Sequence, residues 1–425
     1  MAETQPHVVI LGGGFAGLYA AKTLAKAPVK ITLVDRSNHH LFQPLLYQVA
    51  TAGLSAVDIA RPIRLILKKQ RNVTVLMAEA ERIDPQARRV SLGKAGELSY
   101  DRLIVATGAT HSYFGNEAWE AHAPGLKTLE DALDIRRRVL LAYERAETEP
   151  DPQRRQAYLT FVVIGAGPTG AELAGALSEI AHHTLVSDFR RFDSKQARVL
   201  LLEGMDRVLP PYPPELSAKA QRQLEKLNIE VRTGARVTGI DSGGVWVGEE
   251  RIEARTVIWA AGVAASPLGA SLGAPLDRAG RVKVEKDLSL AGHPECQVVG
   301  DLTSFEQDGA KVPGVAPAAV QQGEHAARNI LRALEGKPSR EFRYRDKGSM
   351  ATLGRKAAVA ELGKIHLSGL PAWLAWLMVH IFFLIGFRNR FVVLFEWAWA
   401  YLTYQRSARL ILHDSPREPP GGPGS

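Results

Sequence analysis

Two stretches of the sequence decide the fold. The first is His7-Val8-Val9-Ile10-Leu11-Gly12-Gly13-Gly14-Phe15-Ala16-Gly17, and the second is Thr160-Phe161-Val162-Val163-Ile164-Gly165-Ala166-Gly167-Pro168-Thr169-Gly170. Each is a short apolar run that ends in G-x-G-x-x-G and leads into an Ala- and Leu-rich helical stretch. The first glycine permits a tight turn, the second lets the backbone approach a pyrophosphate, and the third lets the helix pack closely on the strand. One copy would be weak evidence for a nucleotide site, but two copies are strong evidence.

Each copy also closes with a similar strand and turn, Leu103-Ile104-Val105-Ala106-Thr107-Gly108 in the first and Val257-Ile258-Trp259-Ala260-Ala261-Gly262 in the second. Gly12 and Gly108 are 96 positions apart, and Gly165 and Gly262 are 97 apart. We therefore predict an α/β fold with two Rossmann-type nucleotide-binding domains. The first is expected to comprise residues 5–115 and 285–335, and the second residues 155–265. Residues 340–425 form a separate C-terminal region.

An acidic residue follows each glycine motif at the end of the next apolar strand. Asp35 stands 18 residues after Gly17, and Glu203 stands 33 residues after Gly170. A carboxylate in this place accepts hydrogen bonds from ribose hydroxyls. The alternative is an acid that ends a strand and binds nothing. At Glu203 the acid should repel a 2′-phosphate and favour NADH over NADPH, although Arg207 lies close by.

A third piece completes the first domain. The run Gln297-Val298-Val299-Gly300-Asp301 reads as a short strand that ends in Gly-Asp, and Pro317 opens a helical stretch that continues to Leu334. Proline suits the first turn of a helix, because its missing N–H would have no partner there. We expect the positive end of this helix to stabilise negative charge on a bound group.

Composition excludes several classes of protein. The 425 residues are 46% hydrophobic and 23% charged, which is typical of a globular chain of two or three domains. The single cysteine, Cys296, excludes a disulfide framework and any dithiol redox pair within one chain. The net charge of +8 is scattered and no nucleic-acid-binding motif is present, so we expect no nucleic-acid partner. His39 and His40 are adjacent and lack further ligands at metal spacing, so we expect no metal.

These motifs resemble those of the type II NADH dehydrogenases, which are non-electrogenic NADH:quinone oxidoreductases of the two-dinucleotide-binding flavoproteins. The resemblance includes both glycine motifs, the segment from His39 to Ala50, Val299-Gly300-Asp301 and the C-terminal apolar helices. It implies FAD on the first domain and NADH on the second. The residues expected to bind these cofactors are Gly12, Gly14, Phe15, Ala16, Gly17, Asp35, Arg36, Gln43, Thr107, Gly108, Asp301, Ala318 and Ala319 for FAD, and Gly165, Gly167, Pro168, Thr169, Gly170, Glu203 and Gly262 for NADH.

Two further residues take catalytic roles by the same resemblance. Glu172 is expected in the first turn of the second nucleotide helix and matches a glutamate at the contact between nicotinamide and flavin; the alternative is an ordinary first-turn acid favoured by the helix dipole. Gln321 matches the last glutamine of the quinone motif Ala-Gln-x-Ala-x-Gln, which here reads Ala316-Pro317-Ala318-Ala319-Val320-Gln321. Pro317 replaces the first glutamine, so the contacts to quinone differ from the family pattern.

The C-terminal region is strongly apolar from Leu370 to Phe387 and from Phe391 to Leu402. A helix from Pro371 to Phe387 would be roughly 26 Å long, which is short of a hydrocarbon core of roughly 30 Å. We therefore expect an amphipathic, monotopic pair that lies in the interface, with its tryptophans at headgroup depth. Arginines outnumber acids here and favour an anionic lipid surface; a dimer interface is the alternative. The Pro- and Gly-rich end, residues 416–425, should be disordered.

The resemblance therefore implies an enzyme that passes hydride from NADH to FAD and then two electrons to a membrane quinone. It would act as a peripheral protein on the cytoplasmic face of the cell membrane, and a homodimer is left open. Two rival functions remain. One is a soluble NADH-dependent reductase of a protein electron carrier, and the other is a flavoprotein that senses NADH without catalysis.

Overall fold

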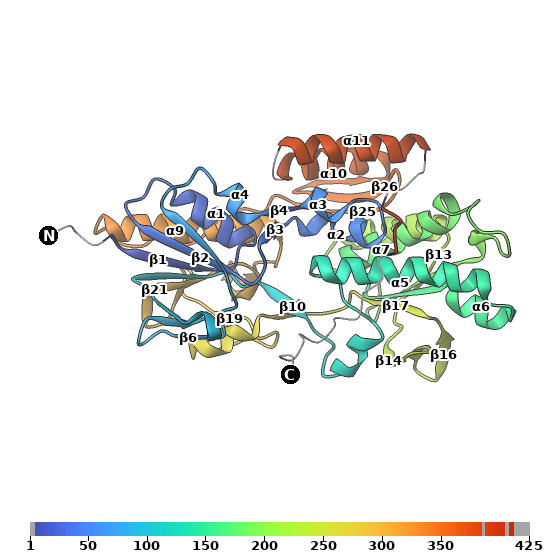
Figure 1. The fold of residues 1–425 in the computed structure, drawn as a ribbon, viewed down its shortest axis with the longest axis horizontal. Helices are drawn as coiled ribbons and strands as arrows, with labels where there is room; N and C mark the ends of the chain where they lie inside the picture. The colour runs from blue at the N-terminus through green and yellow to red at the C-terminus, as the bar shows by residue number, and fades with distance from the viewer. Residues whose placement is uncertain (1–4, 385–386, 404–407, 412–425) are drawn as a thin grey trace, which may run out of the picture.

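The computed structural model describes residues 5–384, 387–403 and 408–411 (Figure 1). The predicted disordered end, 416–425, lies outside the described residues. Two α/β units stand side by side, and a smaller C-terminal layer covers part of both. The first unit contains a six-stranded sheet in the order β20-β21-β9-β1-β2-β5. Its strands are β1 (His7–Leu11), β2 (Lys30–Asp35), β5 (Val73–Met77), β9 (Arg102–Val105), β20 (Ser289–Leu290) and β21 (His293–Val298).

All neighbouring strands of this sheet are parallel except β20 and β21. Helices α1 (Phe15–Thr23) and α9 (Ala316–Leu334) cover one face, where Val8 and Ile10 pack with Ala326 and Ile330. A three-stranded sheet covers the other face; its strands are β6 (Arg82–Asp84), β7 (Arg89–Ser91) and β8 (Glu97–Ser99). The strands are apolar on both faces because both faces are covered.

The second unit contains a four-stranded parallel sheet in the order β13-β12-β11-β17. Its strands are β11 (Thr160–Ile164), β12 (Arg198–Leu202), β13 (Ile229–Arg232) and β17 (Thr256–Trp259). One face packs against helices, which are α5 (Leu129–Thr148), α6 (Pro152–Tyr158), α7 (Pro168–Glu179) and α8 (Pro214–Lys226). A second antiparallel sheet covers the other face, with strands β14 (Val237–Asp241), β15 (Gly244–Val247) and β16 (Glu250–Glu253).

Two antiparallel strands cross between the units. They are β10 (Ala109–His111) and β18 (Val263–Ala265). Equivalent backbone hydrogen bonds hold the two crossings. Ser112 N–H donates to Gly262 O at 3.2 Å, and Ser266 N–H donates to Gly108 O at 3.0 Å. The closing turn of each unit, at Gly108 or Gly262, is thereby bonded to the end of the crossing strand that comes from the other unit.

Short elements fill the surface between these sheets. They are β3 (His39–Leu41), α2 (Leu46–Ala50), α3 (Ala56–Ile59), β4 (Ala60–Pro62), α4 (Ile63–Ile66), β19 (Val282–Lys283), β22 (Thr303–Ser304), β23 (Glu306–Gln307) and β24 (Ala310–Lys311). Helix α2 packs against α5 and α7, so a segment of the first unit contributes to the core of the second.

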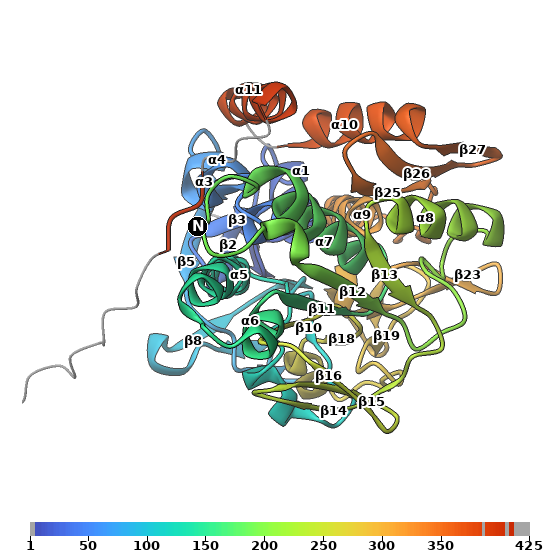
Figure 2. The ribbon, with the colours of Figure 1, turned by 90° about the vertical axis from the view of Figure 1, so that its right-hand side faces the viewer.

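The C-terminal layer is a sheet with two helices. The sheet has strands β25 (Ser349–Gly354), β26 (Ala357–Leu362) and β27 (Ile365–Ser368), and the helices are α10 (Leu370–Phe383) and α11 (Phe387–Thr403). Helix α10 lies on one side of this sheet and α8 on the other (Figure 2). No helix in the described part of the chain is long and apolar enough to cross a membrane.

The tryptophans of this layer are arranged differently from our expectation. Trp373, Trp376 and Trp397 are buried, and only Trp399 of the four is exposed. Trp376 and Trp397 lie with their rings 5.5 Å apart, and Trp397 Nε1–H donates to Gln48 Oε1 at 2.7 Å. Placing all these rings at headgroup depth was therefore wrong, because three of them attach the helices to the rest of the protein.

Candidate functional site

The first glycine loop is shaped by close contacts between backbone atoms. Gly12 has φ of 101°, and a Cβ there would lie 2.3 Å from Ala106 O. A Cβ on Gly17 would lie 1.9 Å from Gly12 O. Gly14 differs, because a Cβ there would meet no atom within 4 Å. The loop is therefore tight at both ends and open in the middle, where a pyrophosphate would approach the backbone.

The second glycine loop repeats this geometry. Gly165 has φ of 99°, and its Cβ would lie 2.5 Å from Ala261 Cα. A Cβ on Gly170 would lie 1.8 Å from Gly165 O, whereas one on Gly167 would meet nothing within 4 Å. In both units the turn that closes the domain, at Ala106 or Ala261, lies directly against the first glycine.

Both loops lead into helices whose N-termini have no side-chain cap. Gly14 precedes α1, and Gly167 precedes α7, which has Pro168 and Thr169 as its first residues. Neither helix carries an acid in its first turn. The free N–H groups and the positive end of the helix dipole are therefore left for an anionic ligand.

The two predicted ribose acids occupy equivalent places and make equivalent bonds. Asp35 Oδ2 accepts the N–H of Gly13 at 2.5 Å, and its Oδ1 accepts the N–H of Ser37 at 2.7 Å. Glu203 Oε2 accepts the N–H of Ala166 at 2.7 Å, and its Oε1 accepts that of Met205 at 2.9 Å. Each carboxylate thus ties the glycine loop to the end of the second strand. A carboxylate has about four acceptor positions, so both acids can still bind a ribose.

The first unit has further groups around its loop. Thr107 Oγ1 is buried, and among the described residues it has no hydrogen-bond partner. Gly108 and Gly300 both have positive φ, 69° and 77°. Asp301 follows Gly300, is half-buried, and lies beside Gly314. A buried hydroxyl without a partner is costly unless a ligand satisfies it, so this place suits a polar cofactor.

Three predicted first-unit residues lie at the edge of this arrangement. Phe15 contacts the rings of His40 and Phe42, at centroid distances of 5.1 and 5.9 Å. Gln43 is exposed, and its amide donates to Lys127 O at 3.2 Å. Arg36 is exposed. Nothing in these contacts assigns Arg36 or Gln43 to the cofactor.

Helix α9 begins at Ala316, one residue before the expected Pro317, and packs closely on α1. A Cβ on Gly323 would lie 2.1 Å from Ala16 O, so the two helices meet there backbone to backbone. Ala318 and Ala319 are buried in the first turn of α9. This contact directs the N-terminus of α9 toward the same end of the sheet as the first glycine loop.

Sequence reasoning missed two side chains that hold these loops. His40 is buried, and its Nδ1 is 2.9 Å from Gly13 O. Burial lowers the pKa of His40 to about 4, so the neutral ring donates from Nδ1. Gln322, also buried, accepts the N–H of Gly300 with Oε1 at 2.6 Å. The sequence predicted the glycine motifs and their acids but not these two supports, which reach the loops from other segments of the chain.

The side chain of Gln321 is already engaged by backbone atoms. Its Nε2 donates to Pro317 O at 3.2 Å and to Arg345 O at 3.0 Å, and its Oε1 accepts the N–H of Arg345 at 3.0 Å. Both amide N–H groups are used, so in this state the side chain offers only one further acceptor position. Gln321 therefore fixes the segment that leads into the C-terminal layer.

Glu172 lies under the C-terminal sheet. It is the fifth residue of α7, beyond the first turn, so the alternative of an ordinary first-turn acid does not apply. Burial raises the pKa of its carboxyl well above the ordinary value, and the N–H of Thr352 at 3.5 Å only weakly opposes this. Gly175 lets β25 approach, because a Cβ there would lie 1.9 Å from Leu353 O. A carboxyl with a raised pKa is thus held between α7 and β25.

Comparisons with known proteins agree with this arrangement. Residues 6–323 match the family model of the pyridine nucleotide-disulphide oxidoreductases, and residues 347–405 match the NDH2 C-terminal domain. A type II NADH:quinone oxidoreductase of Mycobacterium tuberculosis is 47% identical over 422 residues, which cover 95% of this chain and 89% of the relative. One from Staphylococcus aureus is 31% identical over 384 residues, covering 88% and 93%.

The chain belongs to the type II NADH:quinone oxidoreductases. The family and fold predicted from the sequence are thereby confirmed. Among solved structures, NDH2 of Plasmodium falciparum in complex with NADH has the same fold, with a TM-score of 0.87 at 20% identity over 96% of this chain and all of that one.

As a type II NADH:quinone oxidoreductase, the chain has residues that fit a flavin dinucleotide. The first loop offers an open approach at Gly14, uncapped N–H groups on α1 and the buried hydroxyl of Thr107. The second loop offers the same approach at Gly167. Two dinucleotides therefore fit on one chain, one on each unit.

Proposed function

We propose that the chain is an FAD-dependent oxidoreductase that oxidises NADH and reduces a membrane quinone without pumping protons. FAD is held by residues 5–115 and 285–335, and NADH by residues 155–265. The observation that carries this assignment is the pair of equivalent glycine loops, each tied to its own carboxylate, on two units joined by β10 and β18. Because β10 and β18 join the two units, the nicotinamide and flavin rings of two bound dinucleotides can lie face to face, as hydride transfer requires.

When bound, the flavin accepts a hydride and later releases two electrons, and the protein supplies orientation and electrostatics. The N-termini of α1 and α7 bind the two pyrophosphates, and Asp35 and Glu203 accept from the two riboses. The N-terminus of α9, with Ala318 and Ala319, offers N–H groups and a positive dipole to charge that develops at the ring. Asp301 and Thr107 provide polar contacts on the same side.

Glu172 acts on the nicotinamide side. Its raised pKa favours the protonated carboxyl, a form that would present a hydrogen-bond donor and no charge where a hydride leaves. Gln321 acts on the quinone side, where its remaining acceptor position and its hold on Arg345 keep the segment before the C-terminal layer in place. Pro317 offers no side-chain hydrogen bond, so Gln321 carries the contact alone.

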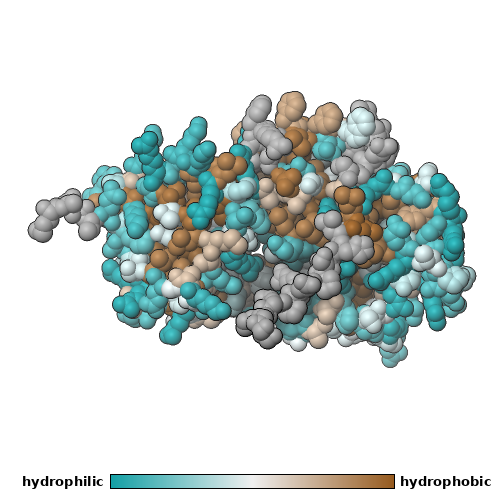
Figure 3. Space-filling model, viewed as in Figure 1, coloured by the Kyte–Doolittle hydropathy of each residue, from teal (hydrophilic) through white to brown (hydrophobic). Residues whose placement is uncertain are grey.

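A membrane surface is the proposed route for quinone. The outer face of α10 exposes Leu370, Leu374, Met378 and Phe382 at intervals of four residues, and α11 exposes Phe391, Phe395 and Trp399. Together they form an exposed apolar surface on the two helices, and apolar side chains gather over α11 at the top of Figure 3. An apolar surface of this kind suits the boundary between headgroups and acyl chains. The same surface would fit a second copy of the chain, so a homodimer is the competing occupant.

Charge next to these helices favours anionic lipid. A groove between α8 and the C-terminal sheet is lined by Lys219, Arg222, Lys226 and Lys356, and it reaches Gly369, just before α10. Only Lys219 of these four forms an ion pair within the described residues, with Glu215. Unpaired cations near a membrane surface attract acidic headgroups. The buried, unpaired thiol of Cys296 suits the reducing cytoplasmic side.

The decisive experiment measures NADH oxidation by the purified, FAD-loaded protein with and without a water-soluble quinone. Quinone-dependent turnover supports the proposal, whereas NADH binding without turnover would favour a sensor. Turnover only with a protein electron carrier would favour the soluble reductase. Flotation with vesicles that contain anionic lipid, compared with neutral vesicles, tests the membrane surface separately.

A further inference from the structure

A strongly basic segment, residues 61–71, runs through β4 and α4 of the first unit. Its five cations are Arg61, Arg64, Lys68, Lys69 and Arg71. Arg61 is half-buried and the other four are exposed. The nearest acid before the segment in the sequence is Asp58, whose carboxylate accepts the N–H of Ser55 at the start of α3, and the next acid after it is Glu79. The basic segment therefore contains five positive charges and no acid of its own.

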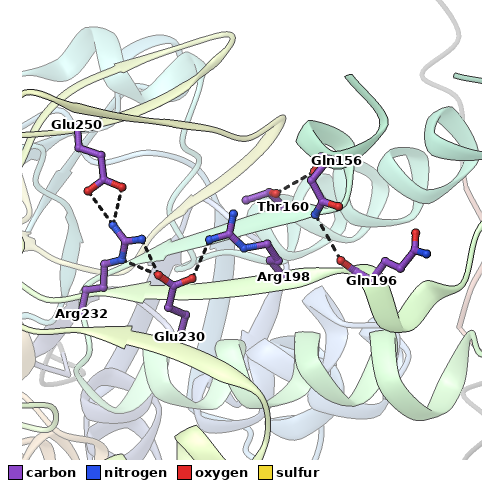
Figure 4. Close-up of polar contacts among 7 residues, drawn as sticks. All are labelled: Gln156, Thr160, Gln196, Arg198, Glu230, Arg232 and Glu250. Atoms are coloured by element: carbon purple, nitrogen blue, oxygen red, sulfur yellow. Dashed lines mark hydrogen bonds and ion pairs between the residues drawn. The ribbon is translucent and has the colours of Figure 1, made fainter. Parts of the chain in front are cut away.

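Many cations elsewhere in the chain are paired with acids. On the second unit, for example, two arginines and two glutamates form a row (Figure 4). Arg198 Nη2 donates to Glu230 Oε2 at 2.8 Å, and Arg232 Nη1 lies 2.9 Å from both oxygens of Glu250. Within the part of the chain that the structure describes, no cation of the basic segment forms an ion pair or a side-chain hydrogen bond. Its charge is therefore left for a partner outside the chain or for solvent.

The basic segment borders the apolar helices of the C-terminal layer. Helix α3, which leads into the segment, packs on α11. Figure 1 and Figure 2 both place α4 on the side of the first unit that borders α11. Two apolar side chains stand out here, because Val57 on α3 is 73% exposed and Leu65 on α4 is 50% exposed. Exposed basic and exposed apolar side chains thus lie together next to α11.

One further cation lies near the basic segment. Lys22 on α1 is half-buried, and its Nζ lies 5.0 Å from the centroid of the Tyr19 ring. Burial is the main cause that lowers the pKa of Lys22, and the positive charge of Arg61 adds to it. Neither cation is ion-paired with an acid of the described chain, so their repulsion is not offset. An anionic partner at this place would offset it.

An acidic lipid surface fits this combination of groups. Basic side chains beside a membrane-surface helix attract acidic headgroups, and exposed Leu and Val side chains enter the boundary between headgroups and acyl chains. Free phosphate would satisfy the cations but leave the apolar side chains in water. Single-stranded nucleic acid is bound with aromatic side chains on which bases stack, and residues 56–71 contain no aromatic residue.

We propose that the basic segment is a second membrane contact, through which the first unit itself lies on acidic lipid headgroups. The inference rests on the proposed membrane surface of α10 and α11 and extends it beyond the C-terminal layer. The groove lined by Lys219, Arg222, Lys226 and Lys356 reaches the start of α10 from the second unit. Cations therefore border the apolar helices from both nucleotide units, and the protein lies with an edge of each unit on the membrane.

A solvated basic surface is the competing explanation, because runs of charge are often exposed without a partner. The two explanations differ in whether the place of the charge matters. If the basic segment is only solvated, removing its cations weakens binding to acidic vesicles no more than removing equal charge elsewhere. If it contacts the membrane, its cations contribute much more than distant ones, and only when the lipid is acidic.

The test uses the FAD-loaded, full-length variant Arg64→Gln/Lys68→Gln/Lys69→Gln. Flotation with vesicles of mixed phosphatidylglycerol and phosphatidylcholine, and with vesicles of phosphatidylcholine alone, measures binding without turnover. A cation close to an acidic surface contributes about fivefold in affinity. Affinity for the acidic vesicles should therefore fall at least about tenfold, while affinity for neutral vesicles stays within about twofold. The difference should disappear near 1 M salt, where the Debye length is about 3 Å.

A matched control removes equal charge from the other side of the first unit. Lys94 lies between β7 and β8, Arg278 lies before β19 and Lys283 lies on it, and all three are exposed. Figure 1 shows β6 and β19 on the side of the first unit that faces away from α10 and α11. The variant Lys94→Gln/Arg278→Gln/Lys283→Gln should bind acidic vesicles within about twofold of the wild type.

Two further variants separate charge from folding. Arg64→Lys/Lys68→Arg/Lys69→Arg keeps the charge and should bind acidic vesicles like the wild type. If the triple glutamine variant does not fold, Lys68→Gln/Lys69→Gln, at two exposed positions, should lower affinity for acidic vesicles at least about fivefold. Flavin absorbance and the melting temperature show whether each variant is intact.

An unchanged affinity in the basic-segment variant, or an equal loss in the control variant, overturns the inference. Loss of FAD from the basic-segment variant, with vesicle binding unchanged, also overturns it and assigns the cations to the cofactor. Failure of the proposed membrane surface looks different, because the wild type would then bind neither kind of vesicle, and the inference falls with it. Failure of the proposed catalysis leaves the result standing, because flotation does not depend on turnover.

Discussion

The two nucleotide units have the same frame but differ in what lies against the helix after the glycine loop. In the first unit α1 packs on helix α9 through Gly323, and in the second α7 packs on strand β25 through Gly175. Two residues after the third glycine, the first unit has Tyr19 and the second has Glu172. The loops, acids and closing turns are otherwise equivalent.

This difference shows which part of the repeat is free to change. Atoms that hold a pyrophosphate and a ribose must keep their places, so both loops keep the same backbone contacts. The outer face of the helix that follows each loop, α1 or α7, makes no contact that a pyrophosphate or ribose requires. In the first unit it accepts α9, whose N-terminus points back to the same site, and in the second it presents the half-buried carboxyl of Glu172 to Thr352.

The largest expected effects come from the third glycines. Gly17→Ala should abolish retention of FAD, because the Cβ would lie 1.9 Å from Gly12 O, a backbone atom that cannot move aside. Gly170→Ala, with a contact of 1.8 Å to Gly165 O, should keep FAD but abolish NADH binding. Flavin absorbance after desalting and titration with NADH measure the two losses. Loss of both nucleotides in both variants would show that the units do not act separately.

Roughly tenfold effects are expected for the two proposed catalytic residues. Gln321→Leu should slow oxidation by quinone and leave reduction by NADH nearly unchanged, and Glu172→Ala should slow the NADH step. Stopped-flow measurement of each half-reaction separates them. Gln322→Leu is a matched control, because Gln322 supports Gly300 and its loss should lower FAD content instead. Equal slowing of both steps by Gln321→Leu would show that Gln321 has only a structural role, through its hydrogen bonds to Arg345.

A smaller effect, roughly fivefold on KM for NADH, is expected for Glu203→Ser. The variant loses the ribose acceptor and also leaves the N–H of Ala166 without its carboxylate. The advantage of NADH over NADPH should narrow, while FAD content stays unchanged. Steady-state kinetics with both nucleotides decide this. A wild type that prefers NADPH would remove Glu203 from the ribose site.

The smallest effect concerns pH. The raised pKa of Glu172 means that the folded protein keeps this proton at a pH where the unfolded chain has lost it. The resulting stability is complete below the ordinary carboxyl pKa and is lost as pH rises through the folded value. Glu172→Gln stays neutral and should lack this decline, melting on the order of 2 °C higher at alkaline pH. Identical melting curves across the pH range would contradict a raised pKa of Glu172.

Much of this arrangement was predictable from the sequence. The glycine spacing predicted both loops, and the apolar strands predicted Asp35 and Glu203 at their ends, because these features are local. The supports of the loops were not predictable. His40 contacts the first glycine loop, Gln322 holds Gly300 and the backbone of Thr352 approaches Glu172, all through contacts between separate segments that no local pattern marks.

The C-terminal layer shows the same limit. Its apolar runs predicted two helices, and two helices are present at Leu370–Phe383 and Phe387–Thr403. Apolar content alone could not show which tryptophans face inward. Trp397 packs into a core built from distant segments, and its indole N–H donates to Gln48 there. For Gln321 the sequence likewise predicted a contact to quinone but not its hydrogen bonds to the backbone of Arg345.

The discontinuous first sheet has a consequence for the order in which the chain acquires structure during synthesis. Strand β9 pairs on one side with β1 and on the other with β21, which is made only after the whole second unit. The second unit is continuous, so it can reach its final topology while the ribosome is still translating the first unit's last strand and helix α9. Until then the β9 edge and the face of α1 that packs on α9 stay uncovered. Newly made chains should therefore need protection over this interval, and FAD should be captured late, after α9 has emerged.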